Sequence, residues 1–187
     1  MLSPGISTSI NLSVQLEEVF GKYIKIEPYC LEDDLDFNIA NSLVVLSSPR
    51  IIKGKIKSLV DRGLNYIIAQ RVINHRYISE LLDLPKATEV LLVNDRAETT
   101  YQTIEQLEAL GINYIKYHPY YPGIDSYPRL NIAVTVGEPN LVPYAVKKVI
   151  NIGTRQIDII TLADIARRLG LIDKLADKLS SKYVNEI

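Results

Sequence analysis

The sequence is poor in cysteine, in histidine and in net charge, and each shortage removes a class of protein. Its 187 residues include one cysteine, two histidines and no tryptophan. A single cysteine cannot form a disulfide within the chain, which excludes a disulfide-stabilised scaffold and favours a reducing cytoplasm. Lys and Arg number 21 against 22 Asp and Glu. This balance gives no sequence-independent affinity for nucleic acid, and we expect no direct contact with it.

Long apolar runs and secretory leaders are missing as well. No run approaches the roughly 18 apolar residues that span a bilayer, and no leader opens the sequence. We therefore expect a cytoplasmic protein without a membrane partner. Apolar residues nevertheless make up 47% of the chain, which is enough for the core of one domain or of two small lobes.

The motifs of common catalytic and metal sites are also absent. The sequence has no phosphate-binding Gly-x-x-x-x-Gly-Lys loop, no Gly-x-Gly-x-x-Gly, no His-Glu-x-x-His and no paired cysteines. His75 and His118 stand without a partner at ligand spacing, and Cys30 is expected to be a small buried residue and not a nucleophile. We expect no catalytic residue, no metal and no cofactor.

Short apolar runs alternate with longer amphipathic ones along most of the chain. Apolar residues at nearly every position are typical of strands buried on both faces of a parallel sheet. Such runs occupy 43–46, 66–69, 90–93 and 149–152. Helical spacing appears at 51–62 and 97–110, where Gly63 and Gly111 predict the helix ends. A helical stripe over 12–20, strands over 23–29, 114–117 and 132–136, and a helix over 140–146 complete the pattern.

The alternation predicts an α/β fold of two small parallel-sheet lobes, doubly wound in the flavodoxin-like manner, with a C-terminal helical extension. We expect an N-terminal lobe over 1–87, whose first strand is truncated because only Met1 and Leu2 precede Ser3-Pro4-Gly5, and a second lobe over 88–171. Apolar residues then recur at three- and four-residue steps towards the end of the chain. For 172–187 two interpretations remain open, a connector helix that projects from the lobes and a terminal helix that lies on the sheet.

Four of the predicted strands are followed, within a few residues, by an arginine. The segments are Ser47-Ser48-Pro49-Arg50, Gln70-Arg71, Asn94-Asp95-Arg96 and Gly153-Thr154-Arg155. Parallel strands would bring these arginines and their polar neighbours to the carboxyl edge of the sheet, where open α/β folds bind ligands. An anion shared by guanidinium and helix N–H groups would also offset the unfavourable position of a cation at a helix start. The alternative is that each arginine pairs with a local acid such as Asp95 or covers surface.

A tyrosine-rich loop over 118–128 is a second candidate for ligand contact. Tyr120 and Tyr121 suit either a pocket wall or a partner surface, because tyrosine combines an apolar face with a polar tip. Further along, Gly137-Glu138-Pro139 lies between a predicted strand and a predicted helix. Glu138 is therefore either a favourable charge at the helix start or a ligand contact.

Four segments in combination resemble one protein family. They are Val-Asn-Asp-Arg-Ala-Glu-Thr at 93–99, Tyr-Tyr-Pro-Gly at 120–123, Ala-Val-Thr-Val-Gly-Glu at 133–138 and Ile-Asn-Ile-Gly-Thr-Arg-Gln-Ile-Asp at 150–158. They resemble the amino-terminal sensor region of sigma-54-dependent transcriptional activators of anaerobic, Clostridium-like bacteria, which is related to the receptor domain of the propionate-catabolism activator PrpR. The resemblance spans roughly residues 3–171. It departs from the family pattern at Val136, where a proline is expected, and in the truncated first strand.

The resemblance implies an effector-binding module of two α/β lobes with the ligand between them. In such regulators a PAS domain, an AAA+ ATPase that acts on sigma-54 RNA polymerase and a DNA-binding domain follow the sensor. We therefore expect a non-catalytic sensor that binds a small anionic metabolite, signals through its C-terminal helix and forms a homo-oligomer in the full-length regulator. The alternative is a small α/β isomerase or lyase acting on a carboxylate, with Asp95 or Glu138 as its base.

Overall fold

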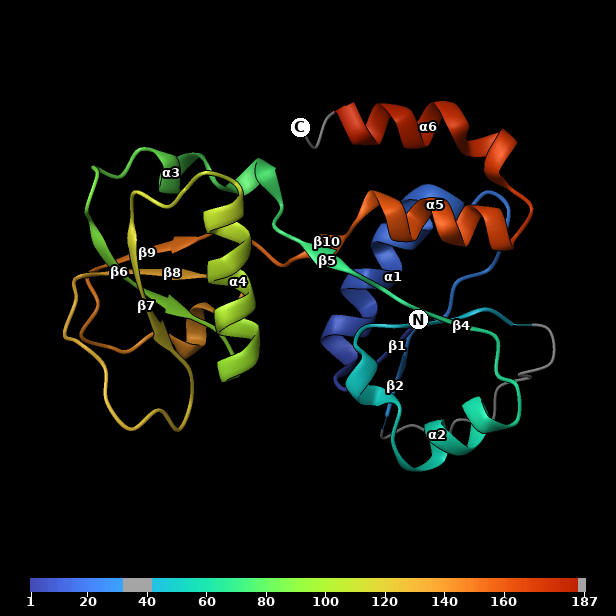
Figure 1. The fold of residues 1–187 in the computed structure, drawn as a ribbon, viewed down its shortest axis with the longest axis horizontal. Helices are drawn as coiled ribbons and strands as arrows, with labels where there is room; N and C mark the ends of the chain where they lie inside the picture. Colours follow the sequence, from blue (N-terminus) through green and yellow to red (C-terminus); the bar gives the residue numbers. More distant parts are fainter. Residues whose placement is uncertain (32–41, 185–187) are drawn as a thin grey trace. The chain divides into compact units, whose positions relative to one another are not determined.

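Apolar strands in two separate groups form two four-stranded parallel sheets, which confirms the predicted fold class (Figure 1). The computed structural model describes residues 1–31 and 42–184. The chain divides into two units: unit 1 comprises Met1–Arg71 and Gln156–Ile187, and unit 2 comprises Val72–Arg155. The chain passes from unit 1 to unit 2 after Arg71 and returns after Arg155. The short strands at these two crossings, β5 (Arg71–Val72) and β10 (Gln156–Ile157), pair with each other.

Unit 1 has a sheet in the order β2-β1-β3-β4, in which every neighbouring pair is parallel. Its strands are β1 (Leu2–Ser3), β2 (Tyr29–Cys30), β3 (Val44–Leu46) and β4 (Tyr66–Ile68). Its helices are α1 (Ile6–Phe20), α2 (Gly54–Asp61), α5 (Ile159–Arg168) and α6 (Ile172–Val184), with a 3-10 turn, η2, at Pro49–Ile51. One apolar cluster joins the sheet to α1, α5 and α6, and another joins it to α2.

Unit 2 has a sheet in the order β7-β6-β8-β9, again parallel throughout. Its strands are β6 (Glu89–Val93), β7 (Lys116–Tyr120), β8 (Ile132–Thr135) and β9 (Lys148–Asn151). The helices are α3 (Ser79–Leu82) and α4 (Ala97–Ala109), with 3-10 turns η3 (His75–Tyr77) and η4 (Pro139–Leu141). Successive side chains of β6 enter two different apolar clusters, which explains why the run 90–93 is apolar at every position.

Two glycines end helices as the sequence predicts. Gly63 follows α2 with φ +90° and Gly111 follows α4 with φ +82°, a backbone region that side-chain-bearing residues rarely adopt. The N–H groups of Leu64 and Ile112 then donate to the carbonyls of Leu59 and Leu107 at 3.0 Å each. These bonds close each helix in a Schellman motif and return the chain towards the next strand.

Three predicted elements differ from the structure. The helix expected over 140–146 is wrong, because Pro143 removes an N–H and disfavours helical backbone before it, and only the turn η4 forms. The strand expected over 23–29 is wrong for most of its length, since Ile24 and Ile26 pack on the core of unit 1 from an irregular segment. The strand expected over 114–117 forms as β7 and extends over Lys116–Tyr120 instead. β7 accommodates Pro119 because it is an edge strand of its sheet.

The two units also differ from the expected lobes 1–87 and 88–171. The segment after β5 packs its apolar residues with β6, β8 and β9, so that Ile73, Ile78 and Leu81 belong to the core of unit 2. The segment after β10 does the reverse, and α5 contributes Leu162 and Ile165 to the core of unit 1. The boundaries therefore lie about sixteen residues before the expected ones, because side-chain packing and not chain order assigns each element.

The last helix belongs to unit 1. Leu175 and Leu179 of α6 are 2% and 6% exposed and lie in the apolar cluster that also holds α1 and α5. The interpretation of 172–187 as a helix that projects away is therefore wrong for α6. The alternative, a terminal helix that lies on the sheet, is correct in that α6 packs on the core of unit 1, but the element that α6 lies against is α5. Among the described residues, no helix has the length and apolar character that a bilayer-spanning segment needs.

Candidate functional site

The register of the unit 2 sheet brings its four carboxyl ends into one row. Val93 of β6 is aligned with Tyr120 of β7 and Thr135 of β8, and Thr135 is aligned with Asn151 of β9. The residues that follow these strands therefore start from a single sheet edge. Nine predicted site residues lie at or just beyond this edge: Asn94, Asp95, Arg96, Tyr120, Tyr121, Gly137, Glu138, Thr154 and Arg155.

The other four predicted residues lie in unit 1. Ser47, Ser48 and Arg50 follow β3, and Arg71 comes three residues after β4. Ser47 is buried, Ser48 and Arg71 are half-buried, and Arg50 is exposed. The expectation that all four arginines share one sheet edge is therefore wrong, because Arg50 and Arg71 follow strands of one sheet whereas Arg96 and Arg155 follow strands of the other.

Arg155 is the buried cation of the unit 2 edge. Arg155 comes four residues after β9 and is 8% exposed. Its Nη1 donates a hydrogen bond to Oε1 of Gln102 on α4 at 3.4 Å. Burying a guanidinium is costly unless polar groups surround it, so the N–H donors of Arg155 favour acceptors at this site. Gln102 was not predicted as a site residue, and its place in the middle of an amphipathic helix gives no local signal of this contact.

Arg96 is exposed and pairs locally. It precedes α4 as the N-cap residue, and its Nε lies 3.4 Å from Oδ2 of Asp95, with the two side chains 57% and 42% exposed. Asp95 also accepts a 2.8 Å hydrogen bond from Oγ1 of Thr99. The alternative that an arginine pairs with a neighbouring acid therefore holds for Arg96, and such an exposed pair contributes little stability.

Asn94 connects the end of β6 to α4. It is 6% exposed, its Oδ1 accepts from the N–H of Asp95 at 2.9 Å, and its Nδ2 lies 3.5 Å from Oγ1 of Thr103. The first contact turns the chain immediately after the strand, as asparagine commonly does. The start of α4 is thereby held at the carboxyl edge of the sheet.

Asn151 holds the two glycine turns of this edge together. Its Oδ1 accepts hydrogen bonds from the N–H of Gly137 and the N–H of Gly153, both at 3.0 Å. Both glycines have positive φ, +88° and +70°. Asn151 was not among the predicted site residues, although an asparagine that ends a strand two residues before a glycine is a recognisable turn signal.

Glu138 begins the turn η4 in place of a helix, so the capping interpretation is not supported. Its side chain makes no capping hydrogen bond, and its N–H donates to Oγ1 of the fully buried Thr135 at 3.2 Å. Its Oε2 is buried. The carboxylate therefore points into the protein at the sheet edge.

The aromatic part of the edge combines Tyr120, the last residue of β7, with the segment that follows it, so the loop expected over 118–128 is wrong for 118–120. The rings of Tyr120 and Tyr127 meet edge to face, with centroids 4.6 Å apart and an angle of 81° between the planes. Tyr121 follows directly and is half-buried. The Tyr120–Tyr127 contact gives this end of the sheet a fixed aromatic wall.

Glu89, Lys116 and His118 form an ionic cluster that begins at the opposite, amino end of β6 and β7. Oε1 of Glu89 lies 3.3 Å from Nζ of Lys116, and Oε2 lies 3.0 Å from Nε2 of His118. Hydrogen bonds from Lys116 and then His118 hold the pKa of Glu89 below its ordinary value. Within the described residues there is no group of three or more His, Cys, Asp and Glu side chains able to hold a metal ion.

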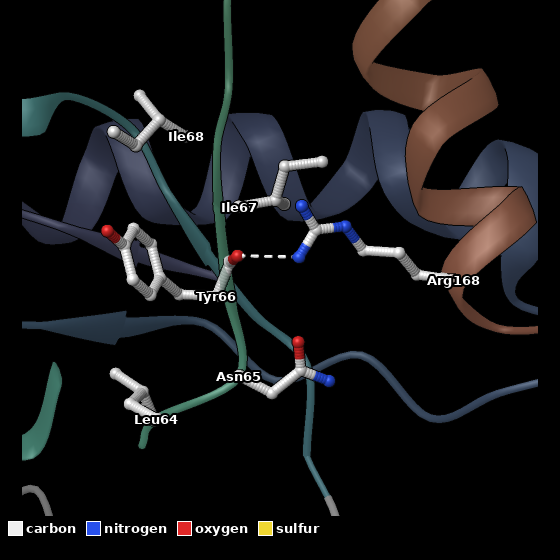
Figure 2. A pocket seen from close by; sticks show the side chains of 6 residues that line it. All are labelled: Leu64, Asn65, Tyr66, Ile67, Ile68 and Arg168. Carbon is white, nitrogen blue, oxygen red and sulfur yellow. Dashed lines mark hydrogen bonds between the residues drawn. The ribbon is translucent and has the colours of Figure 1, made fainter. Parts of the chain in front are cut away.

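One pocket of unit 1 is a groove of about 410 Å³ along the outer edge of β4 (Figure 2). It is lined by 64–68 and by Arg168, whose Nη1 donates to the carbonyl oxygen of Tyr66 at 3.0 Å. Arg168 thus covers an edge carbonyl that would otherwise be available to a further strand. The predicted site residues do not line this groove, so it is separate from the sheet edge described above.

Comparisons with models of protein families, with characterised proteins and with solved structures found no match for this chain.

Proposed function

We propose that this chain is the effector-sensing module of a sigma-54-dependent transcriptional regulator and that it binds a small anionic metabolite without catalysing its conversion. The resemblance of four segments to such sensors supports the regulatory part. The gathering of nine predicted residues at one edge of the unit 2 sheet, with Arg155 buried among them, supports the ligand-binding part. The proposal rests mainly on this gathering of residues at one sheet edge.

The chemistry of this edge suits a carboxylate or a phosphate. A guanidinium of Arg155 provides several N–H donors in one plane, and the start of α4 offers backbone N–H groups with a favourable dipole. Tyr120 and Tyr121 provide apolar faces for the carbon skeleton of a ligand. In this proposal, binding is reported to the domains that follow through α6, and the regulator acts as a homo-oligomer with a PAS domain, an ATPase and a DNA-binding domain.

Calorimetric and thermal-shift titrations with inorganic phosphate and a panel of small carboxylates test the ligand-binding part. A ligand at about 100 times its dissociation constant should add about 2.7 kcal/mol to the free energy of unfolding. Arg155→Ala should weaken that ligand about tenfold or more, since a charge-assisted contact contributes roughly 1.5 to 3 kcal/mol. Arg129→Ala, which changes an exposed arginine on the amino side of β8, is the matched control and should bind normally.

Equal affinities of wild type, Arg155→Ala and Arg129→Ala would contradict the proposed site. The regulatory part is tested in the regulator that contains this chain. There, the ligand identified by titration should change the rate of ATP hydrolysis, and Arg155→Ala should lose that response.

A further inference from the structure

One face of α1 is apolar and exposed although the opposite face already packs on the core. Ile6, Ile10 and Val14 are 48%, 46% and 54% exposed and recur at four-residue steps, so they form one stripe along the helix. The buried side of the same helix carries Leu12, Leu16 and Phe20. The stripe is therefore additional to the surface that fixes α1 in unit 1. An apolar helix face of this kind is typical of a contact with another helix.

The stripe is also free of charge along its whole length. Glu17 is the first charged residue of the sequence, and the neighbours of the stripe on the exposed side, Ser7 and Asn11, are small and neutral. An identical face can approach such a surface without repulsion between like charges. In an antiparallel arrangement about a two-fold axis at Ile10, Ile6 of each copy lies opposite Val14 of the other.

The two ends of α1 supply the charge complementarity of this arrangement. The amino-terminal end lacks an acidic residue in its first turn, and the N-cap residue Gly5 makes no side-chain hydrogen bond to the N–H groups there. The carboxyl-terminal end carries Glu17 and Glu18, and Lys178 of α6 already donates to the carbonyl oxygen of Glu18. The end that lacks a compensating charge is therefore the amino-terminal one.

We infer that α1 docks against α1 of a second copy of this chain, antiparallel and with Ile10 at the two-fold axis. Glu17 lies on the line of the stripe, seven residues after Ile10, so each copy brings a carboxylate towards the amino-terminal end of the partner helix. Apolar side chains fill the centre of the contact and the carboxylates close its two ends. An isologous contact of this kind uses one surface patch twice and gives a closed dimer.

Sedimentation of the full chain over a range of concentrations tests the dimer. Wild type should associate reversibly, and Ile10→Asp should weaken association by about tenfold or more, because it places two carboxylates together at the axis. Ile160→Asp changes an exposed isoleucine of α5 that lies outside the stripe, and it should associate like wild type. Glu17→Gln should weaken the dimer less than Ile10→Asp and should reduce its dependence on salt.

The orientation is tested by disulfide trapping in a Cys30→Ser background. A mixture of Ile6→Cys and Val14→Cys chains should form a mixed disulfide dimer, whereas a parallel pair would link Ile6→Cys to itself. A chain that stays monomeric at every concentration, or an Ile10→Asp variant that associates like wild type, would overturn the inference. A dimer lost in Ile160→Asp but kept in Ile10→Asp would place the contact on α5 instead and would equally overturn it.

Discussion

Gly137 and Thr154 approach each other so closely that Gly137 has no room for a side chain. A Cβ atom on Gly137 would stand 2.6 Å from Cγ2 of Thr154 and 3.3 Å from its backbone nitrogen. The turns after β8 and β9 are thereby packed against each other at the sheet edge where we place the ligand. Position 137 therefore requires a glycine for two reasons, the positive φ of +88° and the close approach of Thr154.

Gly137→Ala is expected to destabilise unit 2 by more than the backbone conformation alone requires. Left-handed backbone costs a residue with a side chain roughly 1 to 2 kcal/mol, and the contact with Thr154 adds to it. Gly111→Ala is the matched control, because Gly111 has φ +82° and no atom within 4 Å of its added Cβ. Urea denaturation should show a larger loss for Gly137→Ala than for Gly111→Ala.

The contribution of the contact itself can be isolated by changing Thr154. Thr154→Ser removes Cγ2, the atom nearest to the added Cβ, and should recover part of the stability lost in Gly137→Ala. If the losses in Gly137→Ala and Gly111→Ala are equal, the turns move apart easily and the packing of this edge is not tight.

Asn151→Ala is expected to loosen the same edge by a different route. The substitution removes the oxygen that accepts the N–H groups of Gly137 and Gly153. Asn151 is exposed, so water replaces part of the lost interaction, and the cost in unfolding free energy should be about 1 kcal/mol. Asn151→Asp keeps an acceptor oxygen and should retain most of the stability. Denaturant unfolding of wild type, Asn151→Ala and Asn151→Asp will measure these differences. Equal losses in both variants would show that the hydrogen bonds are not the source of the effect.

The strands and helix ends that could be predicted are those with a strong local signal. The run 90–93 is apolar at each position because both faces of β6 are buried, and each of its residues is at most 1% exposed. Gly63 and Gly111 mark helix ends because few other residues adopt their backbone angles. Such signals are contained in a few consecutive residues, so the sequence is sufficient to find them.

The assignment of the segments 72–87 and 156–171 to their units could not be predicted, because it depends on contacts between distant parts of the chain. The N–H of Ile157 donates to Oε1 of Gln15 at 2.8 Å across 142 positions. Gln70 likewise donates from its N–H to Oγ1 of Thr161 at 3.1 Å, across 91 positions. These bonds attach β10 and the start of α5 to unit 1. Local periodicity identifies that segment as helical but contains no information about the sheet on which it packs.

The candidate site was predicted in position but not in its internal contacts. Residues after buried parallel strands must gather at a carboxyl edge, so Asn94, Glu138 and Arg155 could be placed there from the strand pattern alone. Their exposure could not be predicted: Arg96 is exposed and Arg155 is buried, although both follow a strand by a few residues. The difference comes from the neighbouring helix α4, whose Gln102 meets Arg155.

Leu179→Ala is expected to destabilise unit 1, because α6 is part of its core. Leu179 is 6% exposed within the apolar cluster of α1 and α5, and such a truncation costs about 2 to 5 kcal/mol. Val184→Ala is the control on the same helix, where the residue is 69% exposed and the change should stay within about 0.5 kcal/mol. A shift of the urea midpoint with an unchanged slope would measure the difference. If the two variants unfold alike, α6 is detached in solution and projects as a connector after all.

The stability of unit 2 is expected to fall with acid in a way that depends on Glu89. Hydrogen bonds from Lys116 and then His118 lower the pKa of Glu89 in the folded state below its ordinary value of 4.5. A carboxyl group with a lowered folded-state pKa contributes stability above its unfolded pKa and loses it as the pH falls through the folded value. Unfolding free energies measured from neutral pH to below pH 4.5 should therefore decrease less steeply in Glu89→Gln than in wild type.

The partners of Glu89 provide the internal control for this pH dependence. Lys116 makes the largest contribution to the lowered pKa, so Lys116→Ala should flatten the acid limb of the stability curve more than His118→Ala does. Both variants should flatten it less than Glu89→Gln, in which no carboxyl group remains to titrate. If the unfolding free energy falls equally with acid in wild type and in Glu89→Gln, the contacts of Glu89 with Lys116 and His118 do not form in solution. Other carboxylates would then determine the acid stability.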